Sequence, residues 1–395
     1  MTTPPLRPKP LPPNGKIAFI SPSNRINYVL PDPLSRSRAL LESLGYTVTI
    51  IFAPKGEEQD LVASDGANIE ACINNRLSEI RAAFSDPSVD AIFCTIGGSL
   101  MTELVPRLVR DTSLHDTVRR NPKIFVGYSD ITILHWALSQ ITGLRTFYGP
   151  CPVTELGEAA TSTSSSVASF PRRSVARSKD IDDGYLQDFN LSHLLRCLTS
   201  LSPLGPVPRS RFYAPLLPPY FFTFSKTATA APRSLLPSPP YTWLRPGRAE
   251  GPLFGGCLTI LPRILSVPSL APRSWASKIL FLESATADAD LSRGAPVAKI
   301  RQAVADIAAH GVFDEIAGLV VGRPYGYTTD AARAEYAAVF RGLLCRGRLA
   351  KRGFPILMNV DIGHTSPMVT LPFGALAALD SEGDRFEILE AGVAA

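Results

Sequence analysis

The feature that most constrains the fold is a regular alternation of short apolar runs and amphipathic segments between residues 15 and 155. The apolar runs predict strands at 15–21 (GKIAFIS), 46–52 (YTVTIIF), 90–96 (DAIFCTI) and 124–126 (IFV). The intervening segments have helical spacing, as at 35–44, where Gly45 supplies a C-cap, and at about 68–84. Near-continuous apolar strands alternating with helices are typical of a parallel sheet that is covered on both faces and binds ligands at the carboxyl ends of its strands. We therefore predict an α/β fold whose functional residues follow the strands.

One predicted strand leads directly into a serine that could act as a nucleophile. In KIFVGYSDITILHW (123–136), Gly127 ends the strand and a helix follows, so Ser129 lies in a tight strand-to-helix turn. A hydroxyl on such a turn stands clear of the backbone, and the amide of Asp130 can stabilise an oxygen that gains charge during acyl transfer. Serine and aspartate are also common helix caps, so a purely structural role for Ser129 or Asp130 is the alternative.

A pair of glycines follows the strand at 90–96. Gly97 and Gly98 lack a Cβ, so their backbone allows a close approach and their amides can bind an oxyanion. An ordinary tight turn is the alternative. The chain contains neither G-x-G-x-x-G nor G-x-x-x-x-G-K-[ST], so a nucleotide-phosphate loop is not indicated.

Two regions have compositions that do not predict a packed core. The Pro-rich residues 1–14 predict a disordered arm. Further along, 159–179 is Ser/Thr-rich without an acidic residue, 200–240 is crowded with proline, and only 189–198 has the pattern of a short helix. We interpret 156–242 as an interdomain linker with a low-complexity insertion, and a gene-model error is the alternative origin of that insertion.

Ordered patterns resume in residues 243–395 and predict a second domain. The expected strands are at 250–261, 278–282 and 317–322, and the expected helices are at 297–309 and 331–344. The block PILMNVDIGHTSPMVTL (355–371) places His364 after Gly363 in a polar turn between two strand-like runs. A lone histidine is often structural. A catalytic role is favoured here because the chain also contains a candidate nucleophile, Ser129.

Ser129 and His364 together suggest a catalytic triad. Serine, acid, histidine is one of the chain orders in which a triad is assembled. The imidazole would take the serine proton, and the acid would fix the imidazole tautomer. Position alone leaves three acids open, because each adjoins a glycine-rich or strand-end turn: Glu250, Glu283 and Asp361.

The composition argues against several other classes of protein. A chain of 395 residues with 45% hydrophobic residues can fill two cores, and its formal charge of +5 comes from scattered basic residues, which disfavours a nucleic-acid partner. The six cysteines show no C-x-x-C spacing, and none of the five histidines has another at i, i+4, so we expect reduced thiols, no metal and no cofactor. The N-terminus has no apolar signal-like run, and no window reaches the roughly 18 apolar residues of a membrane span. We therefore expect a soluble, cytoplasmic protein that does not act at a membrane.

Several motifs, taken in order, resemble those of the LD-carboxypeptidase family, which includes the microcin-immunity serine peptidases. They are TIGGS, GYSDIT, EGPLFGGCL, KILFLES and NVDIGHTSPMVTLPFG, and the resemblance covers residues 15–155 and 243–390. It implies a Ser-Glu-His triad made of Ser129, Glu283 and His364. It further implies an oxyanion hole formed by the backbone amides of Gly98 and Asp130, and no metal.

The resemblance also implies the architecture. It indicates an N-terminal flavodoxin-like or amidotransferase-like parallel-sheet domain at 15–155 and a C-terminal swivelling, β-rich α/β domain at 243–395. The active site would lie between them, and such proteins are commonly homodimers.

These observations lead us to expect a metal-independent serine peptidase or amidase. It would hydrolyse an amide bond near a free carboxylate, through an acyl-enzyme, in a small peptide or peptide-nucleotide substrate such as a muropeptide or a peptidyl-adenylate. The alternative from another class is a catalytically lapsed binding protein of the same fold. A glutamine-amidotransferase-like enzyme is disfavoured, because that chemistry needs a cysteine where this chain has Ser129.

Overall fold

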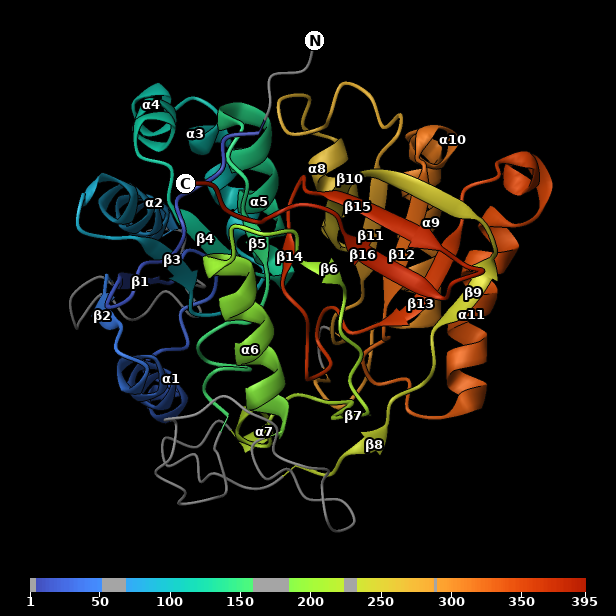
Figure 1. The fold of residues 1–395 in the computed structure, drawn as a ribbon, viewed down its shortest axis with the longest axis horizontal. Coiled ribbons are helices and arrows are strands. Elements are labelled where there is room, and N and C mark those ends of the chain that lie inside the picture. Colours follow the sequence, from blue (N-terminus) through green and yellow to red (C-terminus); the bar gives the residue numbers. More distant parts are fainter. Residues whose placement is uncertain (1–4, 52–68, 159–184, 224–232, 288–289) are drawn as a thin grey trace.

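In the computed structural model, which describes residues 5–51, 69–158, 185–223, 233–287 and 290–395, two β-sheets stand side by side, each accompanied by helices (Figure 1). One sheet has six strands and the other has eight. A separate two-stranded ribbon consists of β7 (Phe212–Tyr213) and β8 (Leu236–Pro237). The predicted combination of a parallel-sheet α/β domain and a β-rich second domain is therefore confirmed.

The first sheet is built from the predicted strands. Its members are β1 (Lys16–Ile20), β2 (Thr47–Ile50), β3 (Ala91–Cys94), β4 (Ile124–Gly127), β5 (Phe147–Tyr148) and β14 (Leu371–Pro372). In the order β2-β1-β3-β4-β5, all neighbours are parallel, and β14 closes the edge antiparallel to β5. Every residue of β3 and β4 is buried, as expected for strands covered on both faces.

The helices of this domain are α1 (Pro31–Ser43), α2 (Ile69–Ser85), α3 (Val105–Leu108), α4 (Thr112–Arg120) and α5 (Thr132–Ala137). Helix α1 begins four residues before the predicted helix, with a proline in its first turn. Proline is tolerated there because the first helical amides have no intrahelical partner. After α1, Gly45 adopts a φ of 93°, which is consistent with the predicted glycine cap.

The second sheet has a parallel centre. Its strands are β9 (Thr242–Arg245), β10 (Arg248–Cys257), β11 (Ile279–Glu283), β12 (Gly318–Gly322), β13 (Ile356–Val360), β15 (Leu376–Asp380), β16 (Arg385–Ile388) and β6 (Gly205–Pro206). Strands β10 to β13 pair in parallel, whereas β9 on one side and β15, β16 and β6 on the other are antiparallel. The accompanying helices are α8 (Leu261–Leu265), α9 (Val297–Ala309), α10 (Val312–Glu315) and α11 (Asp330–Leu344).

The prediction of a disordered arm at 1–14 is wrong for residues 5–14, and residues 1–4 lie outside the described part of the chain. The Leu6 amide donates to the carbonyl of Gly143, and the Leu11 amide donates to the carbonyl of Leu198, both at 2.8 Å. Leu11 is almost fully buried. Proline lacks an amide hydrogen that would need a partner, so a Pro-rich segment with leucines can lie against a finished domain.

The interpretation of 156–242 as a linker without a core also needs correction where the structure describes it. The expected short helix is α6 (Tyr185–Thr199), which lies between the two sheets in Figure 1 and buries Leu194 and Leu198. Helix α7 (Tyr220–Thr223), in the Pro-rich part, buries Tyr220 and Phe221. The low-complexity stretch 159–179 lies outside the described residues.

The two sheets are tied together by exchanged segments. Strand β14 leaves the C-terminal domain to join the first sheet, and β6 leaves the connection to join the second. The Ala394 amide donates to the carbonyl of Pro8 at 3.0 Å, so the two ends of the described chain meet. Among the helices in the described ranges, none is long and apolar enough to cross a membrane.

Candidate active site

The turn after β4 holds Ser129 in a strained conformation. Its φ of 65° is in the left-handed region, which costs a residue other than glycine roughly 1 kcal/mol or more. The strain is held locally, because the Thr132 hydroxyl donates to the Ser129 carbonyl and accepts from the Cys257 amide at 3.1 Å. One threonine at the start of α5 thus joins the serine turn to β10 of the other domain.

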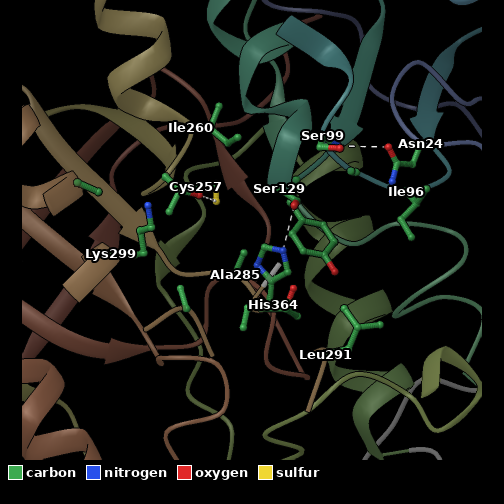
Figure 2. A pocket seen from close by; sticks show the side chains of 18 of the residues that line it. Asn24, Ile96, Ser99, Ser129, Cys257, Ile260, Ala285, Leu291, Lys299 and His364 are labelled. Atoms are coloured by element: carbon green, nitrogen blue, oxygen red, sulfur yellow. Dashed lines mark hydrogen bonds between the residues drawn. The ribbon is translucent and has the colours of Figure 1, made fainter. Parts of the chain in front are cut away.

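The turn directs the Ser129 side chain at His364. The Ser129 Oγ atom lies 3.0 Å from His364 Nε2, and His364 Nδ1 lies 2.7 Å from Glu283 Oε2. Because the carboxylate of Glu283 only accepts, the Nδ1 proton is donated to it, and Nε2 is left to accept the hydroxyl proton of Ser129. The structure therefore brings together the three side chains that the resemblance implied, from β4, β11 and the segment after β13. Figure 2 shows Ser129 and His364 pointing at one another across the domain boundary.

The Glu283 carboxylate is fully buried and has a second partner. The Tyr148 hydroxyl donates to Glu283 Oε1 at 2.6 Å and accepts from the Ser129 amide at 3.1 Å. Burial, reinforced by the charge of Glu283, raises the pKa of Tyr148 well above its usual value, so the hydroxyl keeps its proton as a donor. Sequence reasoning missed Tyr148, which ends the two-residue strand β5.

The imidazole of His364 is packed between the acid and aromatic rings. The ring of Tyr128 lies edge-on to it at 5.1 Å between centroids. The preceding residue must be glycine, because Gly363 has a φ of 94° and a Cβ there would lie 2.4 Å from Glu283 Oε2. This close approach lets the histidine turn pass over the acid.

The other two candidate acids do not pair with His364. One lies on the surface, and the other belongs to a separate hydrogen-bond network. Glu250 is exposed on β10, opposite Ala378 of β15. Asp361 forms a buried ion pair with Arg323 and accepts from the Ser210 amide at 3.1 Å. The structure therefore joins Glu283, and neither Glu250 nor Asp361, to His364.

The glycine pair lies directly against the serine. A Cβ on Gly97 would come within 2.7 Å of the Ser129 Cβ, and Gly98 has a φ of 146°. Asn24, which sequence reasoning also missed, holds this turn from the other side. The backbone amide of Asn24 donates to the Gly97 carbonyl at 3.2 Å, and the side-chain Oδ1 of Asn24 accepts from the Ser99 backbone amide at 3.3 Å.

The side chain of Asp130 points away from the reaction centre. Its Oδ2 accepts from the Ser23 hydroxyl at 2.6 Å and from the Met101 amide at 2.9 Å. Burial raises the pKa of Asp130, although these hydrogen bonds and the charge of Arg263 oppose that rise. The carboxylate thus anchors two loops around the serine turn, and only the backbone amide of Asp130 remains a candidate for oxyanion binding.

A cavity of 720 Å³ opens onto Ser129 and His364. It is lined from both domains and from the connection between them, which contributes Leu217 and Phe221. In the described ranges, no three His, Cys, Asp or Glu side chains are grouped as a metal ion would require. A cavity of this size is large enough for a small organic ligand.

Comparisons with known proteins match both domains of the chain. The family model of the LD-carboxypeptidase N-terminal domain matches residues 17–149, and that of the LD-carboxypeptidase C-terminal domain matches residues 250–379. A probable murein peptide carboxypeptidase of Bacillus subtilis is 29% identical over 391 residues, covering 98% of this chain and 95% of that protein. The microcin C7 self-immunity protein MccF of Escherichia coli is 25% identical over 322 residues, covering 80% of this chain and 79% of that protein. A solved structure of MccF with aspartyl sulfamoyl adenosine has the same fold, with a TM-score of 0.75 and 22% identity, and covers 99% of this chain and all of that one.

Proposed function

The chain belongs to the LD-carboxypeptidase family, and we propose that it is a metal-independent serine carboxypeptidase that uses Ser129, Glu283 and His364 as its triad. The observation that carries this proposal is the continuous hydrogen-bonded series Glu283, His364, Ser129, with distances of 2.7 and 3.0 Å, at the wall of a large cavity. Such a series is the geometry in which a histidine can deprotonate a serine.

In the proposed reaction, His364 Nε2 accepts the hydroxyl proton as Ser129 Oγ attacks the carbonyl carbon of the scissile amide. The negative charge that develops on the carbonyl oxygen is stabilised by the backbone amides of Gly98 and Asp130. Asp130 follows the serine in sequence, and Gly98 follows Gly97, which lies directly against Ser129. His364 then passes the proton to the departing amine, and an acyl-enzyme forms on Ser129. Water activated by the same imidazole releases the acid.

The proposed substrate is a small peptide that carries a free carboxylate next to the cleaved amide, either a muropeptide or a peptide linked to a nucleotide. The name of the Bacillus subtilis relative supports the first class, and the ligand bound to MccF supports the second. We also propose a cytoplasmic homodimer. Light scattering of the purified protein at two concentrations tests the dimer.

Covalent labelling with a fluorophosphonate tests the nucleophile. The reagent should modify Ser129, located by mass spectrometry, and Ser129→Ala should abolish both labelling and hydrolysis of a murein tetrapeptide. Ser99→Ala is the matched control, because Ser99 also lines the cavity but has no histidine partner among the described residues. Labelling that persists in Ser129→Ala would refute the assignment, and a protein that binds the peptide without being labelled would be a binding protein of the same fold.

A further inference from the structure

The cavity beside the triad has two chemically different sides. In the view of Figure 2, Ile96 and Leu291 lie on one side of the Ser129 and His364 pair, and Lys299 lies on the other. The side of Lys299 is formed by α8 and α9, which contact each other, and Arg263 of α8 lines the cavity there as well. A substrate in this cavity therefore meets uncharged residues, including Asn24 and Ser99, on one side and two cations on the other.

The two cations have no partners among the residues that the structure describes. Neither the Arg263 guanidinium nor the Lys299 ammonium makes a hydrogen bond or ion pair with them, and both side chains are exposed to the cavity mouth. The first turn of α9, which contains Lys299, carries no acidic residue. This contrasts with many arginines of the chain, such as Arg76 and Arg323, which pair with carboxylates. Unpaired cations beside a reaction centre are available for a ligand.

The charge of Arg263 reaches the residue next to the nucleophile. Burial raises the pKa of Asp130, and the guanidinium of Arg263 acts against this rise. Arg263 and Ser129 also line the same cavity, so one ligand in that cavity can contact both residues.

We infer that Arg263 and Lys299 form an anion subsite that holds the charged end of the substrate and so decides which amide reaches Ser129. This inference rests on the proposed function, because it assigns the recognition of the substrate's anionic group in the same cavity. A peptide carboxylate and a nucleotide phosphate share the required chemistry, and both are favourable partners for a guanidinium and an ammonium.

One acidic residue reduces the positive charge on this side of the cavity. Asp306 also lines it, seven residues after Lys299 and thus about two turns along α9, roughly 10 Å away. Its carboxylate repels an anionic ligand. Removal of its charge should therefore tighten binding of the same ligands that loss of Arg263 or Lys299 weakens.

The test compares peptides that differ only in charge. The probes are a murein tetrapeptide with a free terminal carboxylate, the same peptide with a terminal amide, and adenosine monophosphate. Dissociation constants are measured by calorimetry in the Ser129→Ala background, so that the result does not depend on turnover. Arg263→Gln/Lys299→Gln is compared with Arg301→Gln, which removes a cation from the same helix at a position that does not line the cavity.

We expect the free acid to bind at least about tenfold more tightly than the amide, as a charge-assisted hydrogen bond provides. This preference should disappear in the double variant, persist in Arg301→Gln, and increase in Asp306→Asn. Loss of affinity for adenosine monophosphate in the double variant alongside an unchanged preference between the peptides would identify phosphate as the anion. The inference would be overturned if the preference for the acid and the affinity for adenosine monophosphate were the same in all variants, or if neither charged probe bound.

The test of the anion subsite can fail or succeed independently of the test of the catalytic serine. If Ser129 is labelled and the peptide is hydrolysed while the double variant keeps both the preference for the acid and the affinity for adenosine monophosphate, the subsite alone is wrong. If Ser129 resists labelling while the preference disappears in the double variant, the subsite stands and the catalytic assignment fails.

Discussion

The Tyr148 hydroxyl and the Glu283 carboxylate form a 2.6 Å hydrogen bond across the domain boundary, and the same hydroxyl accepts from the backbone amide of Ser129. One oxygen atom is therefore linked to both ends of the candidate triad. It fixes which oxygen of Glu283 is left for His364, and it holds the strained serine turn in place.

We expect Tyr148→Phe to lower kcat by about tenfold to a hundredfold with little change in KM. The loss corresponds to one hydrogen bond to a charged group, about 1.5–3 kcal/mol, which matters for orienting His364 and not for binding the peptide. Steady-state kinetics measures both constants. Tyr325→Phe is the comparison, because Tyr325 also packs near His364 but hydrogen-bonds away from Glu283. An equal loss in both variants would assign the effect to general packing.

The identity of the acid is tested by neutral isosteres. Glu283→Gln should lower kcat by on the order of 10⁴-fold, because the imidazole loses the acceptor that fixes its tautomer. Asp361→Asn should mainly lower stability, by about 3 kcal/mol, because it leaves the buried Arg323 without a charged partner. Glu250→Gln, at an exposed position, should change neither. Turnover and melting temperature are measured together, and a Glu283→Gln protein that keeps more than about a tenth of its activity contradicts the assignment.

The contact between Gly97 and Ser129 predicts a further loss of activity. A methyl group at Gly97 would come within 2.7 Å of Ser129 Cβ and 3.1 Å of the Tyr128 carbonyl, so Gly97→Ala must displace the serine turn. Displacement of about 1 Å costs on the order of a hundredfold in rate. Gly342→Ala is the control, because nothing lies within 4 Å of a Cβ there and the residue is helical, so stability should rise by up to about 1 kcal/mol. Unchanged labelling rates in Gly97→Ala would show that the turn tolerates the methyl group.

The sequence was sufficient to predict what depends on local patterns. Apolar runs identified the strands on both sides of Ser129, and the strand-to-helix turn followed from Gly127 and the helical spacing beyond it. His364 was found through its glycine turn and through the resemblance. Each of these features is encoded in a short run of neighbouring residues.

What the sequence could not predict depends on partners that are distant along the chain. Position alone left Glu250, Glu283 and Asp361 as candidate acids. Glu283 and Asp361 each lie where a strand ends, and they differ in their partner, which is His364 for Glu283 and Arg323 for Asp361. Tyr148 gave no periodic signal, because its role requires two groups from different domains. The arm around Leu11 was misjudged because composition measures the tendency of a segment to pack with itself and not against a finished surface.

Removal of metal ions should leave activity unchanged. The proposed mechanism activates Ser129 by His364 and stabilises the oxyanion by backbone amides, so no step uses a metal ion. Dialysis against excess chelator followed by assay of peptide hydrolysis measures this. Activity that is lost on dialysis and restored by zinc would contradict the mechanism. Metal analysis of the dialysed protein is the control for complete removal.

Two buried histidines outside the active site make stability depend on pH. The His193 Nδ1 atom accepts from the Thr370 amide at 3.0 Å, so it cannot carry a proton without breaking that bond. Burial, together with the charge of Arg196, lowers the pKa of His193 to about 4, and burial lowers that of His135 to about 4 as well. Both imidazoles are therefore neutral in the folded protein at pH values where an unfolded chain would already bind protons.

The stability of the folded protein should consequently fall as the pH is lowered from 6.5 towards 4. Because the pKa of each histidine is about 4 when folded, against an ordinary 6.5, the unfolded chain binds more protons in this window and protonation favours unfolding. Each group should remove about 2 kcal/mol between pH 7 and pH 5, and urea unfolding at the two pH values measures the sum. His193→Gln, whose side-chain oxygen can still accept from Thr370, should reduce this loss by about half, whereas substitution of the exposed His310 by Gln should leave it unchanged. An identical pH dependence in His193→Gln and the wild type would show that His193 does not remain neutral through this range.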